Sequence, residues 1–424
     1  MPAVDPGKER NVGIVGHSGV GKTMLLEHIL HDAGITTRMG SIEDGNTVTD
    51  YLEEEIERKH SITMKLCHVE WRGDRIHFVD HPGYIDFQGE IAASSPLVDG
   101  LVILVDATTG VQVGTDIAWK YAEKYTVPRA FFVNKLDREH TDFFQVVAGL
   151  RESYGKQCVP LVIPIGSGGK LERVVNIFDG DTHDIADQIA SLKEEMADAV
   201  AETDDALMEK YLETGELTPD EFHKGLHDGI TAGKIMPIIA GSASQYLGVD
   251  ELLDVIAESF PSPLDRHVLV QNGEASPKEL PVRKEEPFLG QVFRNVVDPY
   301  VGHLTFFRVL TGTLQSDSEF FNVSTGNKER TGKIYLLNGK EQTVVDEVGP
   351  GDLAAVTKLK HTHFGDTIGA LGSTYRLPEI EMPPSMVKLA ISPKTRTDED
   401  KIGDALHRLA EEDPTFSHYR DEAT

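Results

Sequence analysis

Four short segments carry residues whose types and spacing suit the binding of a phosphorylated ligand, and the first of them is rich in glycine. It fits the pattern G-x-x-x-x-G-K-[ST] and consists of Gly16-His17-Ser18-Gly19-Val20-Gly21-Lys22-Thr23. Glycine lets backbone N–H groups approach phosphate oxygens closely. Lys22 would reach the β- and γ-phosphates, and the Thr23 hydroxyl would bind Mg²⁺. The alternative is a chance match in a glycine-rich turn.

The second segment joins a carboxylate to a turn. Asp80-His81-Pro82-Gly83 follows the apolar run 76–79, and Tyr84 comes directly after it. Asp80 would hold Mg²⁺ through a water, and the Gly83 N–H would contact the γ-phosphate. Because Pro-Gly is an ordinary turn signal, this prediction depends on its place after a strand and downstream of the phosphate loop. His81, Pro82 and Tyr84 belong to the predicted contact loop.

The last two segments carry groups that distinguish guanine from adenine. They are Asn134-Lys135-Leu136-Asp137 and Ser242-Ala243. The Asp137 carboxylate can accept both the N1–H and N2–H₂ donors of guanine, whereas adenine would leave that charge unpaired. Asn134 would brace the loops, the Lys135 stem would cover the face of the base, and Ser242-Ala243 would offer an N–H to O6. Each segment alone is a plain polar turn, but their order predicts GTP or GDP with Mg²⁺ as ligands.

The four segments must be positioned by strands and helices. Apolar runs at 11–15, 76–79, 130–133 and 237–240 precede them and predict buried strands. Helical patterns at 23–33, 115–125 and 250–260 fill the crossovers. This alternation predicts an α/β P-loop GTPase domain, with a mostly parallel sheet and helices on both faces. The four loops would then meet at the carboxyl ends of the strands.

The pattern changes along the chain and predicts three domains. Residues 1–265 form the predicted GTP-binding domain, with an acidic, helix-rich inserted subdomain at about 158–231 whose default interpretation is a solvated insert. Short strands separated by glycine turns at 280–372 predict an antiparallel β-barrel domain. Residues 383–424 begin a partial α+β domain, with a strand at 387–391 followed by an amphipathic helix that carries Ile402, Leu406 and Leu409.

Beyond these motifs, the chain resembles the translational GTPases and most closely elongation factor G. Residues 50–58 resemble that family's first switch segment, Gly351-Asp352-Leu353-Ala354-Ala355 its second domain, and 409–416 its third. The resemblance implies hydrolysis of GTP to GDP and phosphate on the ribosome. It also implies that Ser61 stands where the family has a Mg²⁺-binding threonine, so Ser61 is a better ligand candidate than Thr63. From the local sequence, a solvated acidic helix ending in a polar turn is as good an interpretation of this segment.

Two residues depart from the family pattern, and so does the length. Tyr84 stands where the family usually has a histidine that orients the attacking water, and Gly19 where its phosphate loop usually carries an aspartate. These variants resemble a divergent, second-copy group of elongation factor G-like proteins, and the chain stops within the third domain. The roles of Lys22 and Tyr84 in catalysis are therefore expectations. The alternatives are a GTP-gated binding module with weak or no hydrolysis and no translocation, or a ribosome-protection or release-type factor.

Composition narrows the expected partners. The sequence has 41 basic and 70 acidic residues, a net charge of −29, which opposes non-specific binding to RNA or DNA. A ribosomal partner would be met through local basic patches or basic proteins. No apolar run approaches a membrane span, and the two cysteines match no metal spacing. We expect a cytoplasmic monomer with neither membrane nor DNA as a partner.

Overall fold

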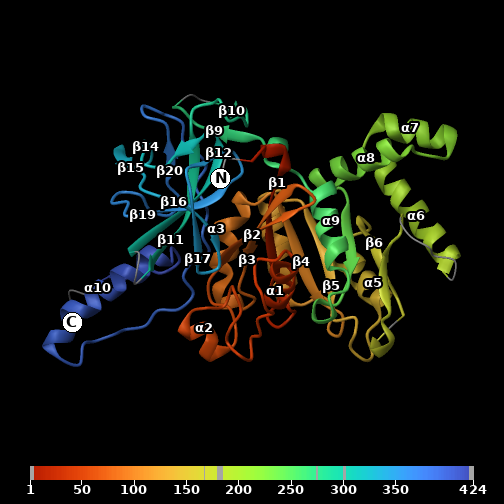
Figure 1. The fold of residues 1–424 in the computed structure, drawn as a ribbon, viewed down its shortest axis with the longest axis horizontal. Coiled ribbons are helices and arrows are strands. Elements are labelled where there is room, and N and C mark those ends of the chain that lie inside the picture. The colour runs from red at the N-terminus through yellow and green to blue at the C-terminus, as the bar shows by residue number, and fades with distance from the viewer. Residues whose placement is uncertain (1–3, 167, 179–184, 274–275, 299–301, 420–424) are drawn as a thin grey trace.

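An eight-stranded sheet carries all four predicted ligand loops. In the computed structural model, which describes residues 4–166, 168–178, 185–273, 276–298 and 302–419, the strand order is β2-β3-β1-β4-β5-β8-β6-β7 (Figure 1). Neighbouring strands from β3 to β6 are parallel, whereas the edge strands β2 and β7 pair antiparallel. The predicted α/β architecture with a mostly parallel sheet is confirmed.

The strands of this domain are β1 (Glu9–Gly16), β2 (Lys65–Trp71), β3 (Asp74–Asp80), β4 (Gly100–Asp106), β5 (Arg129–Asn134), β6 (Cys158–Ile165), β7 (Arg173–Asn176) and β8 (Met236–Ala240). Its helices are α1 (Lys22–Asp32), α2 (Glu53–Arg58), α3 (Gln88–Ser94), α4 (Val113–Lys124), α5 (Phe143–Tyr154), α6 (Ala186–Ala201), α7 (Asp205–Thr214), α8 (Pro219–Thr231) and α9 (Val249–Ser259). Every residue of β1, β4 and β5 is buried. Strands covered on both faces need continuous apolar runs, and these strands supply them.

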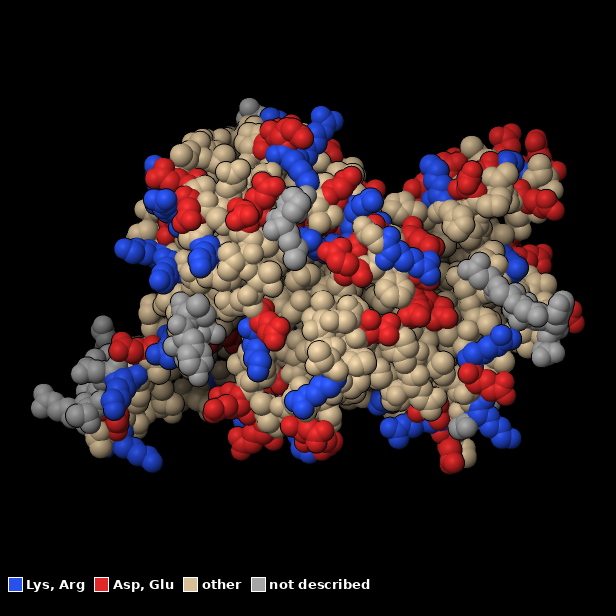
Figure 2. Space-filling model, in the orientation of Figure 1, with Lys and Arg blue, Asp and Glu red and all other residues tan. Residues whose placement is uncertain are grey.

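Helices α6, α7 and α8 extend to one end of the molecule, beyond β6 and β7 (Figure 1). They fall within the insert predicted at about 158–231, of which residues 167 and 179–184 lie outside the described chain. The buried residues of α6, among them Ile189, Leu192 and Met196, recur at helical spacing and attach the insert to the domain core. Acidic side chains predominate over α7 (Figure 2). The insert is thus anchored on one face and solvated on the other.

The second region is antiparallel, as predicted. Its main sheet has the order β15-β14-β20-β11-β12-β19-β16-β17, and β13 with β18 and β9 with β10 form small sheets. The bounds are β9 (Val268–Val270), β10 (Lys278–Leu280), β11 (Leu289–Asp298), β12 (Gly302–Thr311), β13 (Leu314–Gln315), β14 (Glu319–Asn322), β15 (Asn327–Arg330), β16 (Ile334–Asn338), β17 (Glu341–Val345), β18 (Glu347–Val348), β19 (Leu353–Thr357) and β20 (Thr367–Gly369).

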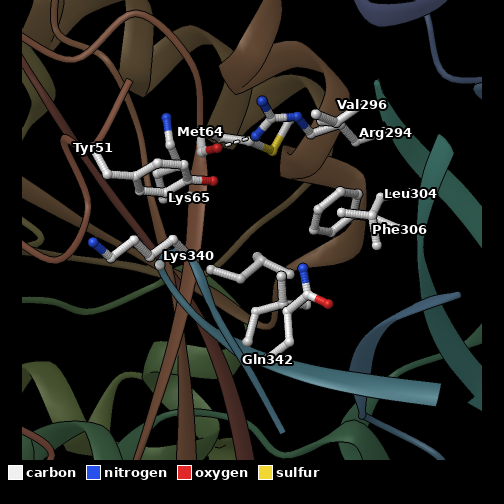
Figure 3. A pocket seen from close by; sticks show the side chains of 12 residues that line it. Tyr51, Met64, Lys65, Arg294, Val296, Leu304, Phe306, Lys340 and Gln342 are labelled. Carbon is white, nitrogen blue, oxygen red and sulfur yellow. Dashed lines mark hydrogen bonds between the residues drawn. The ribbon is translucent and has the colours of Figure 1, made fainter. Parts of the chain in front are cut away.

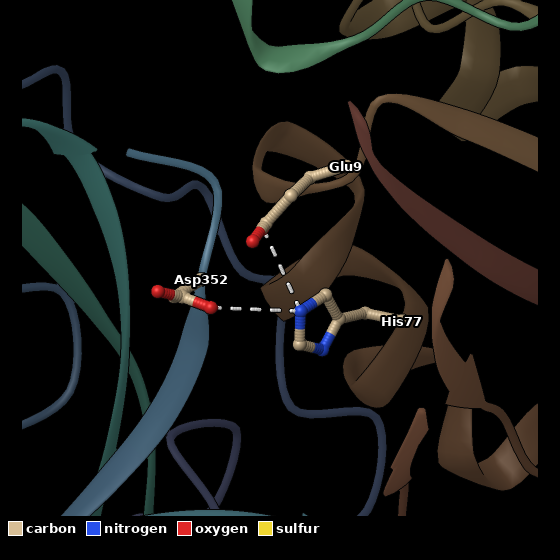
Figure 4. A group of neighbouring side chains, drawn as sticks. All are labelled: Glu9, His77 and Asp352. Atoms are coloured by element: carbon tan, nitrogen blue, oxygen red, sulfur yellow. Dashed lines mark ion pairs between the residues drawn. The ribbon is translucent and has the colours of Figure 1, made fainter. Parts of the chain in front are cut away.

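Buried charges join the two regions. Arg308 of β12 is 1% exposed, and its Nη2 atom lies 2.6 Å from Asp99 Oδ1, just before β4. Nearby, His77 Nε2 lies 3.6 Å from Glu9 Oε2 and 3.8 Å from Asp352 Oδ1 (Figure 4). The buried Arg75 guanidinium approaches both carboxylates, within 4.0 Å. Arg75 therefore faces two buried acids, Glu9 of the first region and Asp352 of the second, and the cluster lies at the contact between these regions.

A second contact joins β11 to the chain that precedes β2. The Arg294 guanidinium donates to the Met64 carbonyl, beside a cavity lined by Tyr51, Lys65 and Phe306 (Figure 3). On the other side of Met64, its N–H donates to Glu90 Oε2 at 2.7 Å. The second region therefore holds the segment that leads back from Ser61 into the sheet.

The predicted strand at 387–391 is wrong. These residues have no regular structure, and Val387 and Leu389 are 71% and 85% exposed. Within the described chain no strand pairs with them, and an isolated strand leaves its backbone groups to water. The helix predicted after it is present as α10 (Arg396–Glu412). Among the described residues, no helix has the length and apolar character needed to span a membrane.

Candidate guanine-nucleotide site

The phosphate loop leaves β1 and enters α1, which is the strand–loop–helix setting that the motif requires. Gly21 caps the helix with φ +100°, a backbone conformation open to glycine. A Cβ there would lie 2.5 Å from Asn134 Nδ2, so the close approach of the two loops also demands glycine. The backbone N–H groups of the first turn of α1 have no partner within the helix and can receive an anion.

Lys22 folds over this loop. Its ammonium donates to the carbonyls of Gly16 and His17 at 3.0 and 2.9 Å. Burial lowers the pKa of Lys22, while the carboxylates of Asp80 and Asp50 oppose that shift. The two carboxylates thus favour a charged Lys22 beside the loop that a triphosphate would fill.

Asn134 connects three of the four loops. Its Nδ2 donates to the Val20 carbonyl of the phosphate loop at 2.7 Å, and its Oδ1 accepts from the Ala243 N–H at 2.8 Å. The side chain is 2% exposed, so these bonds are shielded from water. The bracing role that the sequence predicts for Asn134 is therefore matched by two buried hydrogen bonds.

Asp137 and Ser242 face each other across the base-binding end. Ser242 Oγ donates to Asp137 Oδ1 at 2.6 Å, and Ser244 Oγ lies 3.4 Å from Oδ2. Leu136 contributes its N–H to the Gly241 carbonyl at 3.3 Å, which ties the two loops together. The half-buried carboxylate is thus oriented before any base arrives.

Lys135 crosses the space between the base end and the phosphate loop. Its ammonium donates to the Gly19 carbonyl at 2.6 Å and to Asp106 Oδ2 at 2.7 Å. It adopts φ +66°, an unfavourable conformation for a residue with a side chain. Asp106, at the end of β4, is an addition to the residues predicted from the sequence. A carboxylate at the carboxyl end of a parallel strand is the signal that could have found it.

At the γ-phosphate end, Asp80 carries the clearest sign of a cation-binding position. It is 2% exposed, and within the described chain neither carboxylate oxygen has a hydrogen-bond partner. Burial raises its pKa, followed by repulsion from Asp50, while Lys22 and the nearby Thr49 hydroxyl oppose the shift. Buried carboxylate oxygens without donors are expected where a cation or its water belongs.

Oxygen donors converge beside Asp80. Thr23 Oγ1 lies 3.4 Å from Ser61 Oγ and 3.4 Å from Asp50 Oδ2. Thr63, the other candidate, instead accepts from Lys65 Nζ at 2.6 Å. Hydroxyl and carboxylate oxygens are the donor types that Mg²⁺ prefers, so the residues fit that ion. Asp50 is an addition to the predicted set, although it opens the segment that resembles the family's first switch.

Glu55 organises the segment that presents Ser61. It lies in α2 and is 0% exposed, and its Oε1 accepts from the N–H groups of Ile62 and Thr63 at 3.1 and 3.3 Å. The same oxygen receives Lys65 Nζ at 2.7 Å. Of the two interpretations of 50–58, the solvated acidic helix describes the exposed residues of α2 but not Glu55. Because three glutamates stand in a row at 53–55, the sequence alone did not indicate which of them would be buried.

Gly83 touches the phosphate loop directly. A Cβ there would lie 2.4 Å from Lys22 Nζ and 2.7 Å from Ser18 Cα, so this close approach is open to glycine alone. Tyr84 follows and is 43% exposed. His81 points elsewhere, since its buried ring lies 3.2 Å from the Ile14 carbonyl and 2.5 Å from Ser94 Oγ. Its imidazole belongs to the core, and only its main chain runs with Pro82 along the loop.

A strand–phosphate-loop–helix unit, with Asp80, Asn134 and Asp137 gathered at the same edge of a mostly parallel sheet, defines the class of P-loop proteins. Residues 7–262 match the family described as elongation factor Tu GTP binding domain, 287–371 match elongation factor G domain 2, and 382–424 match elongation factor G domain III. The chain therefore belongs to the elongation factor GTP-binding family and carries the domains of elongation factor G-like translational GTPases.

A solved structure has the same arrangement. A crystal structure of a protein from Thermus thermophilus matches with a TM-score of 0.86 and 31% sequence identity. The match covers 97% of this chain and 62% of that one. The chain thus spans somewhat less than two thirds of the length of that relative.

Proposed function

We propose that this protein binds GTP with Mg²⁺ and hydrolyses it to GDP and phosphate in association with the ribosome. One observation carries the proposal. The buried Asn134 side chain fastens the phosphate loop at Val20 to the second base loop at Ala243. A triphosphate cradle and a base-reading carboxylate, Asp137, are thereby held at a fixed separation, which is the arrangement that one guanine nucleotide needs.

The base preference follows from Asp137. Its carboxylate, oriented by Ser242, can accept the N1–H and N2–H₂ donors of guanine as a fork. Adenine offers no such pair, so binding it would leave a half-buried charge without donors. The Lys135 stem would lie over the base, since its ammonium already spans from Gly19 to Asp106.

Hydrolysis would occur at the γ-phosphate end of the site, opposite the base-binding end that contains Asp137. Thr23, Ser61, Asp50 and Asp80 would hold Mg²⁺, which neutralises charge on the phosphates. Lys22 would leave the Gly16 and His17 carbonyls for the β- and γ-phosphates and stabilise negative charge as the phosphoryl group transfers. The Gly83 N–H would hold the γ-phosphate, and a water beside Tyr84 would attack in line.

Ribosome association, cytoplasmic location and a monomeric state follow from the resemblance to elongation factor G. Tyr84 and Gly19 support placing the chain in a divergent, second-copy group of that family. With a net charge of −29, contact with the ribosome would use local basic patches or basic proteins.

The test is multiple-turnover release of phosphate from GTP, with and without ribosomes, and with ATP as the competing substrate. We expect turnover of GTP that ribosomes stimulate, and no comparable turnover of ATP. Tight GTP binding without turnover under both conditions would favour the alternative, a GTP-gated binding module, which Tyr84 supports because a phenol is a poor proton acceptor near neutral pH. Equal uptake of ATP and GTP would overturn the base assignment itself.

A further inference from the structure

The imidazole of His60 packs against Tyr84, the residue beside which the proposed function places the attacking water. Its ring centroid is 4.4 Å from that of Tyr84, with the rings tilted by 45°. Tyr84 follows Gly83, which lies against Ser18 and the Lys22 ammonium of the phosphate loop. The two rings therefore stand at the γ-phosphate end of the site, on opposite segments of its rim.

The backbone conformation directs the side chains of His60 and Ser61 towards different parts of the γ-phosphate end. Lys59 has φ +56° and ends α2 with a left-handed residue, so the chain turns back sharply. The His60 N–H then donates to the Glu55 carbonyl at 3.2 Å, and Ser61 Oγ comes within 3.4 Å of Thr23 Oγ1. Ser61 thus reaches the metal position while its neighbour His60 packs on Tyr84.

The contacts of the ring set its chemistry. His60 Nδ1 lies 3.2 Å from the Ser61 carbonyl, an oxygen that can only accept. In the neutral imidazole the proton therefore sits on Nδ1, and Nε2 keeps a lone pair. In the described part of the chain Nε2 has no hydrogen-bond partner. A phenol such as that of Tyr84 can donate a hydrogen bond but accepts a proton poorly.

We propose that His60 is the water-positioning residue of this GTPase, with Tyr84 as the surface that holds its ring. This rests on the proposed function. His60 Nε2 would accept a hydrogen bond from the water while the water oxygen forms a bond to the γ-phosphorus. The bond from that phosphorus to the β,γ-bridging oxygen breaks, its electron pair leaves with GDP, and the water protons pass to the inorganic phosphate and solvent.

The experiment measures single-turnover phosphate release from preformed GTP complexes on ribosomes, alongside GTP affinity by calorimetry. His60→Ala should slow release at least ~10-fold with GTP affinity unchanged within about twofold, because only an interaction of the water is lost. His60→Gln, which keeps an acceptor, should recover part of the rate. Tyr84→Phe, which keeps the ring surface but removes the hydroxyl, should lose less of the rate than His60→Ala. His223→Ala, an exposed histidine of α8, is the matched control and should match the wild type.

Relocating the imidazole gives a readout that a merely structural role would not move. In the His60→Ala background, Tyr84→His should raise the release rate again, because it returns an imidazole to the same rim. A wild-type rate in His60→Ala, or a larger loss in Tyr84→Phe than in His60→Ala, would overturn the proposal while leaving GTP hydrolysis intact. Absence of turnover by the wild type itself would overturn the proposed function, and this inference with it.

Discussion

The base-binding end of the site satisfies its polar groups within the protein, whereas the γ-phosphate end leaves several without partners. Asn134 donates one short hydrogen bond and accepts another, and Asp137 accepts one from Ser242; all three link neighbouring loops. In the described chain, both oxygens of Asp80, Asp50 Oδ1 and the Thr49 hydroxyl are buried without such bonds. An unsatisfied buried group costs about 1–3 kcal/mol. The first end is therefore saturated by the described chain itself, and under the proposed function the second would be completed by the nucleotide and its metal.

Under the proposed function, this difference would let one site serve both as an anchor for the base and as a sensor of the γ-phosphate. The pre-organised base end would bind GTP and GDP alike, because both carry guanine. The unsatisfied end would gain partners only when the γ-phosphate and its metal are present. A ligand shifts a conformational equilibrium only by its differential interaction with the two states. Under the proposed function, the interactions that differ between GTP and GDP would be those of Asp80, Gly83 and Ser61.

The largest expected effect on nucleotide affinity comes from a substitution at the base-binding end. Asp137→Asn should weaken binding of both GTP and GDP by at least ~10³-fold, because the amide sets a donor opposite the donors of guanine. Xanthosine nucleotides, which carry a carbonyl in place of the N2 amine, should bind the variant better than GTP does. Calorimetry with the four nucleotides measures both. Ser244→Ala is the control, because it removes the 3.4 Å contact to Asp137 and a 3.2 Å contact to Ser242 Oγ but keeps the Asp137 carboxylate. Unchanged GTP affinity in Asp137→Asn would refute the base assignment.

The next effect should separate GTP from GDP. Gly83→Ala places a Cβ against the Ser18 backbone and the Lys22 ammonium, so its loop cannot keep its present approach. GTP affinity should fall by about 10-fold or more, whereas GDP affinity should stay within about twofold. Gly332→Ala, where a Cβ meets nothing within 4 Å and φ is not positive, controls for the loss of a glycine outside the site. Equal losses for GTP and GDP would show that the two ends are not distinct.

A smaller effect concerns the metal. Ser61→Ala should raise the Mg²⁺ concentration needed for half-maximal GTP binding by several-fold, because one oxygen donor beside Thr23 is lost. Thr63→Ala is the matched control, since its hydroxyl serves Lys65 instead. Titration of Mg²⁺ against binding of a fluorescent GTP analogue measures both. A larger shift in Thr63→Ala than in Ser61→Ala would reverse the assignment.

The sequence predicted the base end better than the γ-phosphate end, for a physical reason. Asn134 ends the buried strand β5 and Asp137 lies in the short loop that follows it, so local sequence determines where they lie. Glu55 and His60 are placed by a segment whose course depends on Lys65, Arg294 and Glu90. Such distant contacts leave no local pattern. The strand expected at 387–391 failed similarly, because an alternating pattern cannot reveal whether a partner strand exists.

Within the described part of the chain, buried carboxyls without hydrogen-bond partners also occur away from the nucleotide site, at the contact between the two regions. Glu9 at the domain contact also lacks hydrogen-bond partners among the described residues, and burial raises its pKa to about 8, against the attraction of Arg75 and Arg308. Burial likewise raises the pKa of Asp352 to about 7, followed by repulsion from Glu9. At neutral pH these two carboxyls therefore hold protons in the folded protein, whereas in the unfolded chain, where their pKa values are ordinary, they have already released them. Stability should therefore fall as pH rises towards 8.

Glu9→Gln should reduce this fall. Between pH 6.5 and 8, where the neighbouring His77 is neutral because burial lowers its pKa to about 4, only the carboxyls titrate in this cluster. The decrease in the unfolding temperature over that interval should shrink by roughly 2–4 °C, measured by calorimetry. Glu53→Gln, at an exposed acid of α2, should keep the wild-type slope. GTP affinity should not change in Glu9→Gln. A change in affinity would mean that the domain contact and the nucleotide loops are coupled, and that unpartnered groups at both places respond to the same ligand.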